Sequence, residues 1–452
     1  MDFLISLLRG IFGIALIIGI AFIFSNNKKK INWRLVGSGI LLQVFFAIII
    51  LKGNELRNYS FIFGLPKDFF NWFSGFIVLI LNFTGEGSKF VFGNLALSPG
   101  MGGSLGFFFA FQVVPTIIFF ASLMSLLYHY GIMQKIVQGM AWVMAKIMGT
   151  SGAESLSCTA NIFVGQTEAP LMVKPFLKTL TNSELLTIMI GGMATIAGGV
   201  MAAFVQILGA SYAAEAHIPL QQAQLYFANH LLGASVMAAP AAMLIGKILF
   251  PETSDPETKG NVKLKIEKTA GNGIEAAATG ASDGLTLALN VAAMLIAFIA
   301  LIALVNYALT GLGDFLSINN YLKTTFGKPL SFQLILGLIL QVVAIGIGVP
   351  MNDALNFGSL IGTKIVLNEF VAYLDLGKMI SEGVLKNNKS ILMATYALCG
   401  FANISSIAIQ LGGIGPLAPE RKPDIAKLGV RAVLGGTLAT LMTATLAGIL
   451  FN

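Results

Sequence analysis

The chain has 452 residues, of which 56% are hydrophobic and only 11% are charged, and its formal net charge is +7. Soluble domains average about 25% charged residues, so this composition excludes an ordinary soluble protein and indicates a multi-pass membrane protein. The basic residues are scattered and form no basic–aromatic stripe, which argues against nucleic-acid binding. The two cysteines, Cys158 and Cys399, are too few for a disulfide framework, and no Cys/His cluster has metal-ligand spacing.

Eight apolar stretches approach the ~20 residues that are needed to cross about 30 Å of hydrocarbon. No small-residue cleavage site follows the first stretch, so we expect a retained helix rather than a signal peptide. Gly and Pro recur inside several stretches, which membrane helices tolerate. The expected spans are residues 3–24, 33–51, 106–130, 184–209, 223–250, 285–310, 389–411 and 427–450.

The lysines and arginines of the short loops set the expected orientation. The basic loops 28–34, 251–284 and 421–427 all lie in the cytoplasm if the N-terminus is outside. Residues 69–92 are apolar enough to span, but a crossing there would move the loop 251–284 outside, so we expect an interfacial helix. Charge counting does not decide whether residues 331–349 span or lie at the interface.

The order of segments predicts an internal repeat. In each half a span and an apolar segment precede a polar-tipped segment and two further spans. Such repeats with interrupted helices mark transporter sites, and an odd number of crossings between the halves would invert them. We therefore expect an all-α polytopic protein with about eight transmembrane helices, two re-entrant helical hairpins and an inverted repeat. The expected units are the N-terminal scaffold 1–105, the first repeat 106–250 with its hairpin near 151–180, the cytoplasmic linker 251–284, and the second repeat 285–452 with its hairpin near 353–384.

Both polar-tipped segments carry a carboxylate at membrane depth. Glu168 lies in the first segment, after Gln166 and Thr167, and Glu369 lies in the second, after Asn368. An ionisable group at this depth costs about 2.5–3.5 kcal/mol or more, so it usually faces a cavity or a substrate path. A Gln side chain offers a donor and an acceptor that suit the edge of a nucleobase or amide, and a carboxylate accepts two hydrogen bonds, which suits a vicinal diol.

Two interrupted spans supply further polar groups. In the stretch 389–411, Asn403 and Ser406 are three residues apart and share one helix face, and Phe401 can provide an apolar wall. In the matching stretch, Thr195 lies between two Gly-Gly pairs. Hard cations prefer oxygen ligands, so Asn161, Thr195 and freed backbone carbonyls could form a cation cage.

Three motifs resemble those of the concentrative nucleoside transporter family. The family pattern Gly/Ala-x-Lys-x-x-x-Asn-Glu-Phe-Val-Ala-Tyr/Met/Phe is complete at Gly362–Tyr373. The segments Gln166–Pro170 and Gly400–Ser406 resemble the first hairpin tip and the third signature of the family. The resemblance extends from about residue 100 to the C-terminus, whereas residues 1–99 match only in having few spans, as in bacterial members.

The resemblance implies a nucleoside site and a sodium site. Threonine at position 195, where serine is familiar, keeps the hydroxyl but adds a methyl group. The resemblance also implies a homotrimer with a fixed scaffold. The implied base contacts are Gln166, Thr167 and Glu168 with Val200 packed on the base, the ribose contacts are Glu369, Asn403 and Ser406 with Phe401 beside them, and the sodium ligands are the side chains of Asn161 and Thr195 with the carbonyls of Val164, Thr195 and Ile196.

Other interpretations stay open at this point. Glu168 can be a structural carboxylate paired with Lys174 or Lys364. Asn403 and Ser406 can be helix–helix hydrogen-bond groups. Asn161 and Thr195 can be mere caps of a hairpin and a helix. A membrane hydrolase would need a Ser/His, metal or cofactor motif, which the sequence lacks, and a passive channel or a structural protein would not need paired side chains matched to base and ribose.

The function that we expect is symport: uptake of nucleosides across the cytoplasmic membrane of a bacterium, driven by sodium, with the hairpins moving as in an elevator between two access states. The expected partners are the nucleoside, the sodium ion, the lipid bilayer and two further copies of the chain. We expect no enzymatic activity. The alternative within transporters is proton coupling through a membrane carboxylate.

Overall fold

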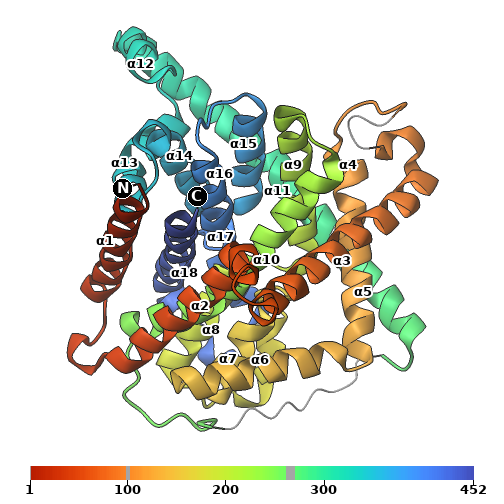
Figure 1. Ribbon diagram of the computed structural model, residues 1–452, viewed down its shortest axis with the longest axis vertical. Helices are drawn as coiled ribbons and strands as arrows, with labels where there is room; N and C mark the ends of the chain where they lie inside the picture. Colours follow the sequence, from red (N-terminus) through yellow and green to blue (C-terminus); the bar gives the residue numbers. More distant parts are fainter. Residues whose placement is uncertain (1, 98–101, 261–269, 452) are drawn as a thin grey trace.

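A computed structural model describes residues 2–97, 102–260 and 270–451, and within these ranges the chain forms helices and no β-strand. Figure 1 shows the helices gathered into one body, with the two termini on the same side. The central part of the expected linker 251–284, residues 261–269, lies outside the described residues.

Residues 2–92 contain three long helices. They are α1 (Asp2–Ile23), α2 (Trp33–Arg57) and α3 (Phe61–Phe92). The Asn32 side chain accepts from the backbone N–H of Leu35 at 3.2 Å and so caps α2. α3 begins before the expected residue 69, and its 32 residues are long enough and apolar enough to cross a membrane. Its placement at the interface stays a prediction.

Helices α5 (Val114–His129) and α11 (Gly273–Phe315), which are far apart in the sequence, run alongside each other. α5 follows the short α4 (Phe109–Gln112), and it packs along α11. α11 is longer than the expected span 285–310, because residues 273–284, the Gly/Ala-rich part of the expected linker, are also helical. Gly280 and Gly284 lie against α5, where an added Cβ would come within 2.6–2.8 Å of α5 atoms, so glycine permits the close approach.

The two halves repeat the same order of elements. A helix (α6 or α13), a short hairpin, a helix broken in the middle and a long helix follow one another in each half. α13 has 15 residues, about 22 Å of helix, which is too short to span alone. The inverted orientation of the halves stays a prediction. The first half contains α6 (Ile132–Met148), α7 (Gly152–Ala160), η3 (Ala169–Phe176), α8 (Asn182–Ala194), α9 (Gly198–Ala216) and α10 (Leu220–Leu249), and the second contains α13 (Phe332–Gly346), α14 (Ala354–Val366), α15 (Glu369–Ser381), α16 (Asn388–Leu398), α17 (Ser405–Gly413) and α18 (Lys422–Leu450).

The remaining short helices connect these units. These short helices are η1 (Lys28–Lys30), η2 (Gly93–Ala96), α12 (Asn319–Phe326), η4 (Met351–Asp353) and η5 (Pro419–Arg421). Of these, α12 projects from the body at the end of α11 (Figure 1).

Burial separates a central group of helices from a peripheral group. In the most apolar windows of α10 and α18, 100% and 89% of the residues are buried, whereas in α1 and α11 only 22% are. The peripheral helices expose large apolar side chains, which water would not tolerate over such an area and which lipid accepts. Eight helical segments in the described ranges are long and apolar enough to cross a membrane, so the structure agrees with a multi-pass membrane protein.

The expected number of about eight spans agrees with this total, but the membership differs. α3 is among the eight segments, and the expected span 389–411 is not, because its two parts, α16 and α17, have only 11 and 9 residues. The spans expected at 184–209 and 389–411 are each two helices joined by a non-helical stretch.

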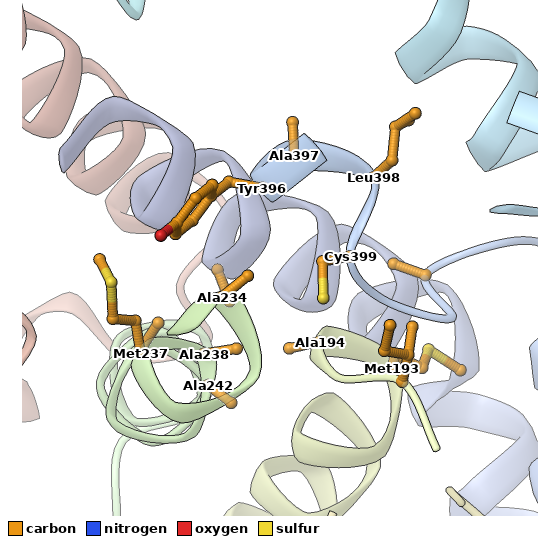
Figure 2. Close-up of a cluster of buried hydrophobic side chains, with 14 of the residues drawn as sticks. Met193, Ala194, Ala234, Met237, Ala238, Ala242, Tyr396, Ala397, Leu398 and Cys399 are labelled. Atoms are coloured by element: carbon orange, nitrogen blue, oxygen red, sulfur yellow. The ribbon is translucent and has the colours of Figure 1, made fainter. Parts of the chain in front are cut away.

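The two broken helices meet on α10. Figure 2 shows the end of α8 (Met193, Ala194) and the end of α16 (Tyr396 to Cys399) packed on α10. The contact surface of α10 carries Ala234, Ala238 and Ala242, four residues apart, and this small-residue spacing lets helix backbones approach closely in membranes. Both halves therefore place the helix end before the break against α10, whose most apolar window is fully buried.

Candidate functional site

The first hairpin, residues 151–180, is polar at both its base and its tip. Ser151 and Glu154 form a capping box at the start of α7, with Glu154 Oε1 accepting from the Ser151 N–H at 2.7 Å. α7 ends before Asn161, whose Nδ2 donates to the Ser157 carbonyl at 2.9 Å. At the tip, Glu168 Oε2 accepts from the Gly165 N–H at 2.9 Å. The glutamate thus closes the turn before η3 begins.

The second hairpin, residues 353–384, has a helix on each arm. α14 and α15 meet at Leu367 and Asn368, and the Asn368 side chain caps α15 by accepting from the Val371 N–H at 3.0 Å. Glu369 is the first residue of α15 and is buried. The first turn of a helix is where a negative charge is most favourable, so the local fold supports a buried carboxylate here.

Each hairpin is bound to a break in the neighbouring helix. The Gly198 N–H, at the start of α9, donates to the Phe163 carbonyl of the first hairpin at 3.0 Å. The Ile404 N–H, just before α17, donates to the Ile365 carbonyl of the second hairpin at 3.0 Å. These bonds satisfy backbone groups that a broken helix leaves free at membrane depth.

The two breaks also contact each other. The Phe401 N–H donates to the Thr195 carbonyl at 3.3 Å. Gly400 lies against the end of α8, where an added Cβ would come within 2.7 Å of the Met193 carbonyl oxygen. Glycine is therefore required at position 400 so that the two repeats can approach at this point.

One chain of hydrogen bonds joins the two hairpin tips through the start of α17. Asn403 Nδ2 donates to Glu369 Oε2 at 3.0 Å, and Asn403 Oδ1 accepts from the Ser406 N–H at 2.8 Å. Ser406 Oγ accepts from Gln166 Nε2 at 3.0 Å. All four residues are buried. Gln166 Oε1 is a buried acceptor without a donor, so the chain has an open end at the first hairpin.

The other expected substrate contacts lie around this hydrogen-bond chain. Thr167 faces α17, where a Cβ on Gly413 would come within 2.5 Å of its Cγ2. Phe401 is half-buried in the break before α17, and Val200 is buried in the first turn of α9. Glu168 is exposed, and it has no described partner besides the Gly165 N–H. The structure thus joins Gln166, Glu369, Asn403 and Ser406 directly and leaves the Glu168 carboxylate outside that chain.

The expected sodium ligands lie at the first hairpin and the first break. Asn161, Val164, Thr195 and Ile196 are all buried. Asn161 Oδ1 has no hydrogen-bond partner, whereas Thr195 Oγ1 donates to the Gly191 carbonyl at 2.9 Å. A buried oxygen without a donor fits a hard cation, and no charged ligand is needed for a monovalent one. The described residues contain no cluster of three His, Cys, Asp or Glu side chains that could hold a metal ion.

Three family models match this chain and together cover most of it. A model described as "Na+ dependent nucleoside transporter N-terminus" matches residues 12–95, and the corresponding C-terminal model matches residues 230–448. Between them, a model described as "Gate: Nucleoside recognition" matches residues 110–211, which include the first hairpin. The chain belongs to the concentrative, Na⁺-dependent nucleoside transporter family.

Similar proteins span the whole length of this family member. An uncharacterized transporter of Bacillus subtilis, YutK, is 43% identical over 98% of this chain and 99% of its own length. The nucleoside permease NupC of Helicobacter pylori is 39% identical over 98% of both chains. The solved structure of CNTnw in an inward-facing substrate-bound state has a TM-score of 0.82 at 38% identity and covers 98% of both chains.

Family membership confirms the motif-based resemblance and corrects its extent. The sequence motifs limited the resemblance to about residue 100 onward, and this limit was wrong, because the family model of the N-terminus matches residues 12–95. The N-terminal helices carry few polar signatures, so their kinship lies in an apolar pattern that motif inspection misses. The family and the solved relatives are transporters, so the expectation of a transporter rather than an enzyme is confirmed.

Among the described residues, Glu168 lacks the lysine partner that its structural interpretation requires, although it closes the turn at Gly165. Glu168 forms no ion pair with Lys174 or Lys364 in the structure, and Lys364 donates instead to the Ala397 carbonyl and to Thr440. For Asn403 and Ser406, helix–helix bonding and substrate binding use the same groups, because both residues connect α17 to the hairpins. These contacts leave the choice to binding experiments.

Sequence reasoning assigned no role to Gln410, which adjoins the site in this family member. Its Nε2 donates to the Met189 carbonyl at 2.9 Å, and its Oε1 is a buried acceptor without a partner. A Cβ on Gly192 would touch both Gln166 Cβ and Gln410 Nε2, so the two glutamines come close together at that glycine. The helical spacing of Asn403, Ser406 and Gln410 was the available signal, because residues at i, i+3 and i+7 share a face.

Proposed function

We propose that this transporter imports nucleosides by symport with sodium, using the inward sodium gradient. The observation that carries the proposal is the chain of hydrogen bonds from Glu369 through Asn403 and Ser406 to Gln166. It runs between the tips of two hairpins, and it contains a carboxylate, two amides and a hydroxyl at membrane depth. A ligand with a diol at one end and a nucleobase at the other can exchange its own hydrogen bonds for these.

The ribose end of the proposed site is at the second hairpin. Glu369 and Asn403 present paired acceptor and donor groups, which match the two hydroxyls of a ribose. Ser406 adds a hydroxyl from the next turn, and the half-buried ring of Phe401 covers this end. The buried position of the carboxylate strengthens its hydrogen bonds, because water does not compete for them.

The base end of the proposed site is at the first hairpin. Gln166 keeps one amide oxygen free, and Thr167 and Glu168 follow it on the same tip. Val200, in the first turn of α9, supplies an apolar surface for the base. Glu168 contacts the substrate only if it leaves the Gly165 N–H, so we propose that it engages the base after substrate enters.

The proposed sodium site lies beside the base end. Its side-chain ligands are Asn161 and Thr195, and its backbone ligands are the carbonyls of Val164, Thr195 and Ile196. Sodium bound there orders the tip of the first hairpin, because Asn161 and Val164 directly precede the turn that carries Gln166. Binding of the ion thus favours binding of the nucleoside, which is the coupling that a symporter requires.

Transport itself requires alternating access. We propose that the hairpins move with their broken helices as one unit, in an elevator-like step, against a scaffold of peripheral helices in a homotrimer. Support comes from solved relatives, since CNTnw has been seen in an inward-facing state and a variant of it in an outward-facing state. The bonds from each hairpin to its broken helix would move with the unit and would not break.

Uptake of radiolabelled uridine and adenosine into proteoliposomes tests this proposal. An inward sodium gradient should drive accumulation, and replacement of sodium with choline should abolish it at constant pH. An imposed inward proton gradient in choline should not restore it. Full uptake in choline with acid outside would reject the sodium site and favour proton coupling, and no uptake of any nucleoside under either gradient would reject the proposal.

A further inference from the structure

The ammonium group of Lys364 is fully buried in α14, on the first arm of the second hairpin. Its Nζ donates to the Ala397 carbonyl at 2.8 Å and to Thr440 Oγ1 at 3.0 Å. Within the part of the chain that the structure describes, no carboxylate lies within 4.0 Å of it. Lys247, also buried, differs in this respect, because it pairs with Glu154 at 2.8 Å. The direct partners of the Lys364 ammonium are therefore neutral oxygens, and the Glu369 carboxylate attracts it only from a longer distance.

The position of the Ala397 carbonyl explains why a cation belongs there. Ala397 lies in the last turn of α16, directly before the break that carries Asn403. Carbonyls in the last turn of a helix have no intrahelical partner and carry partial negative charge. Lys364 neutralises this charge from the neighbouring hairpin and so ties the second hairpin to the helix end beside the ribose site.

The first repeat has the same layout without a lysine. The bonds from Gly198 to Phe163 and from Ile404 to Ile365 are equivalent, since each joins a hairpin carbonyl to the start of the second part of a broken helix. They align Phe163 with Ile365. The preceding residues are then Ile162 in the first repeat and Lys364 in the second.

The residues one step further back also correspond. Asn161 in the first repeat aligns with Thr363 in the second. Asn161 Oδ1 and Thr363 Oγ1 are both buried, and both lack a hydrogen-bond partner. Each repeat thus has a free oxygen next to a helix break. Only the second repeat brings its own positive charge to that place, because the aligned Ile162 is apolar.

We propose that Lys364 is a tethered cation, which takes in the second repeat the place that sodium takes in the first. It acts as a positioning residue, because it fixes the end of α16 and so holds Asn403 against Glu369. The comparison with sodium rests on the proposed function above. In this arrangement the lysine permanently supplies the positive charge at the break after α16, and only the break after α8 responds to the sodium concentration.

Nucleoside binding to the purified protein tests the inference, with Lys364→Met as the variant. Methionine replaces the apolar part of the lysine side chain atom for atom and removes only the ammonium group. At a fixed moderate sodium concentration, the dissociation constant should rise about tenfold or more, as expected when a charged hydrogen-bonding group is lost. High sodium, or small added ammonium ions, should restore binding, because a free cation can then occupy the vacated place beside the Ala397 carbonyl and Thr440. The sodium titration of the variant should be steeper than that of the wild type.

Lys247→Met is the matched control. It removes a buried lysine of α10 that pairs with Glu154 at the base of the first hairpin, away from the tip. It should lower the melting temperature, because it leaves the Glu154 carboxylate unpaired, yet added cations should not sharpen its sodium titration. Two results for Lys364→Met would overturn the inference: wild-type affinity with a wild-type sodium titration, or weak binding in an assembled protein that no cation restores. The second result would show a merely structural lysine.

A milder variant keeps the test valid if Lys364→Met does not assemble. Thr440→Val removes one of the two acceptors of the ammonium and leaves the charge in place. It should weaken nucleoside binding several-fold with an unchanged sodium titration slope, and wild-type affinity would contradict the positioning role. The wild-type titration separates the two proposals. Sodium-independent binding by the wild type would reject the proposed sodium coupling, while the response of Lys364→Met to ammonium ions would still decide the role of Lys364.

Discussion

The tips of the two hairpins carry the same chemical group in opposite surroundings. Glu369 is buried, begins a helix and accepts from Asn403, whereas Glu168 is exposed and accepts from the backbone of its own turn. The Glu369 carboxylate is therefore held toward the neighbouring broken helix, whereas the Glu168 carboxylate is held by its own turn. The difference suggests a division of roles, in which the second hairpin anchors the substrate and the first responds to it.

The largest effect is expected for the anchoring carboxylate. Glu369→Gln should reduce nucleoside uptake by roughly tenfold to a hundredfold, because a charged hydrogen bond contributes about 1.5–3 kcal/mol and the amide has only one acceptor oxygen. Uptake of uridine in proteoliposomes measures the effect, with size-exclusion chromatography to establish assembly. Nucleosides without ribose hydroxyls should bind poorly to the wild type. Wild-type rates in the assembled variant would remove Glu369 from the ribose site.

The next effect concerns the cation beside the first hairpin. Asn161→Ala or Thr195→Val should raise the sodium concentration for half-maximal uptake by about two- to tenfold, since each variant loses one neutral oxygen ligand. Thr195→Ser is the matched control, because it keeps the hydroxyl, and its sodium dependence should stay near that of the wild type. Sodium titrations of uptake at constant pH make the measurement. An unchanged titration in both test variants would place the ion elsewhere.

A smaller effect is expected from the neutral groups at the first tip. Gln166→Ala should change the ratio of uridine to adenosine uptake a few-fold, because the lost amide is the group that we propose to read the base. Thr167→Ala should shift the same ratio. Competition assays with both nucleosides and with ribose alone measure the selectivity. Equal weakening for all of these ligands would mean that the two residues do not distinguish bases.

The smallest effect on affinity is expected for the exposed carboxylate. Glu168→Gln should weaken nucleoside binding less than Glu369→Gln, since water screens an exposed charge and competes for its hydrogen bonds. The amide oxygen can still accept from the Gly165 N–H, so the turn should persist. Dissociation constants of the two variants, measured side by side, test the comparison. Equal losses would show that both hairpins anchor the substrate to the same extent.

The sequence predicted the polar tips well because their signal is local. A carboxylate at membrane depth is rare, and a glutamate after Asn368 at the start of a helix combines a capping residue with a site residue in one motif. Glu369, Asn403, Gln166 and Ser406 were all expected at the site, and the structure brings them into one hydrogen-bond chain. Their roles stay predictions, because only a substrate can define them.

Other features were hidden because they depend on distant contacts. The Gly-Gly pair at 191–192 lies inside α8, and the helix breaks later, where Phe401 can donate to Thr195. Residues 273–284 were expected to belong to the linker, yet they form the start of α11, where Gly280 and Gly284 pack closely against α5. In both places a partner far away in the sequence decides the local structure.

The bond between the Phe401 N–H and the Thr195 carbonyl also constrains how the protein is made. The two residues are 206 positions apart, so at about 5–20 residues per second the ribosome delivers the partner of Thr195 roughly 10–40 s late. During that interval the break in the first half lacks its donor and Gly400 has no surface to meet. The first half therefore stays in the membrane or at the insertion machinery without this contact until the second half has been made. Biogenesis therefore ends with a docking step between two halves that were inserted one after the other.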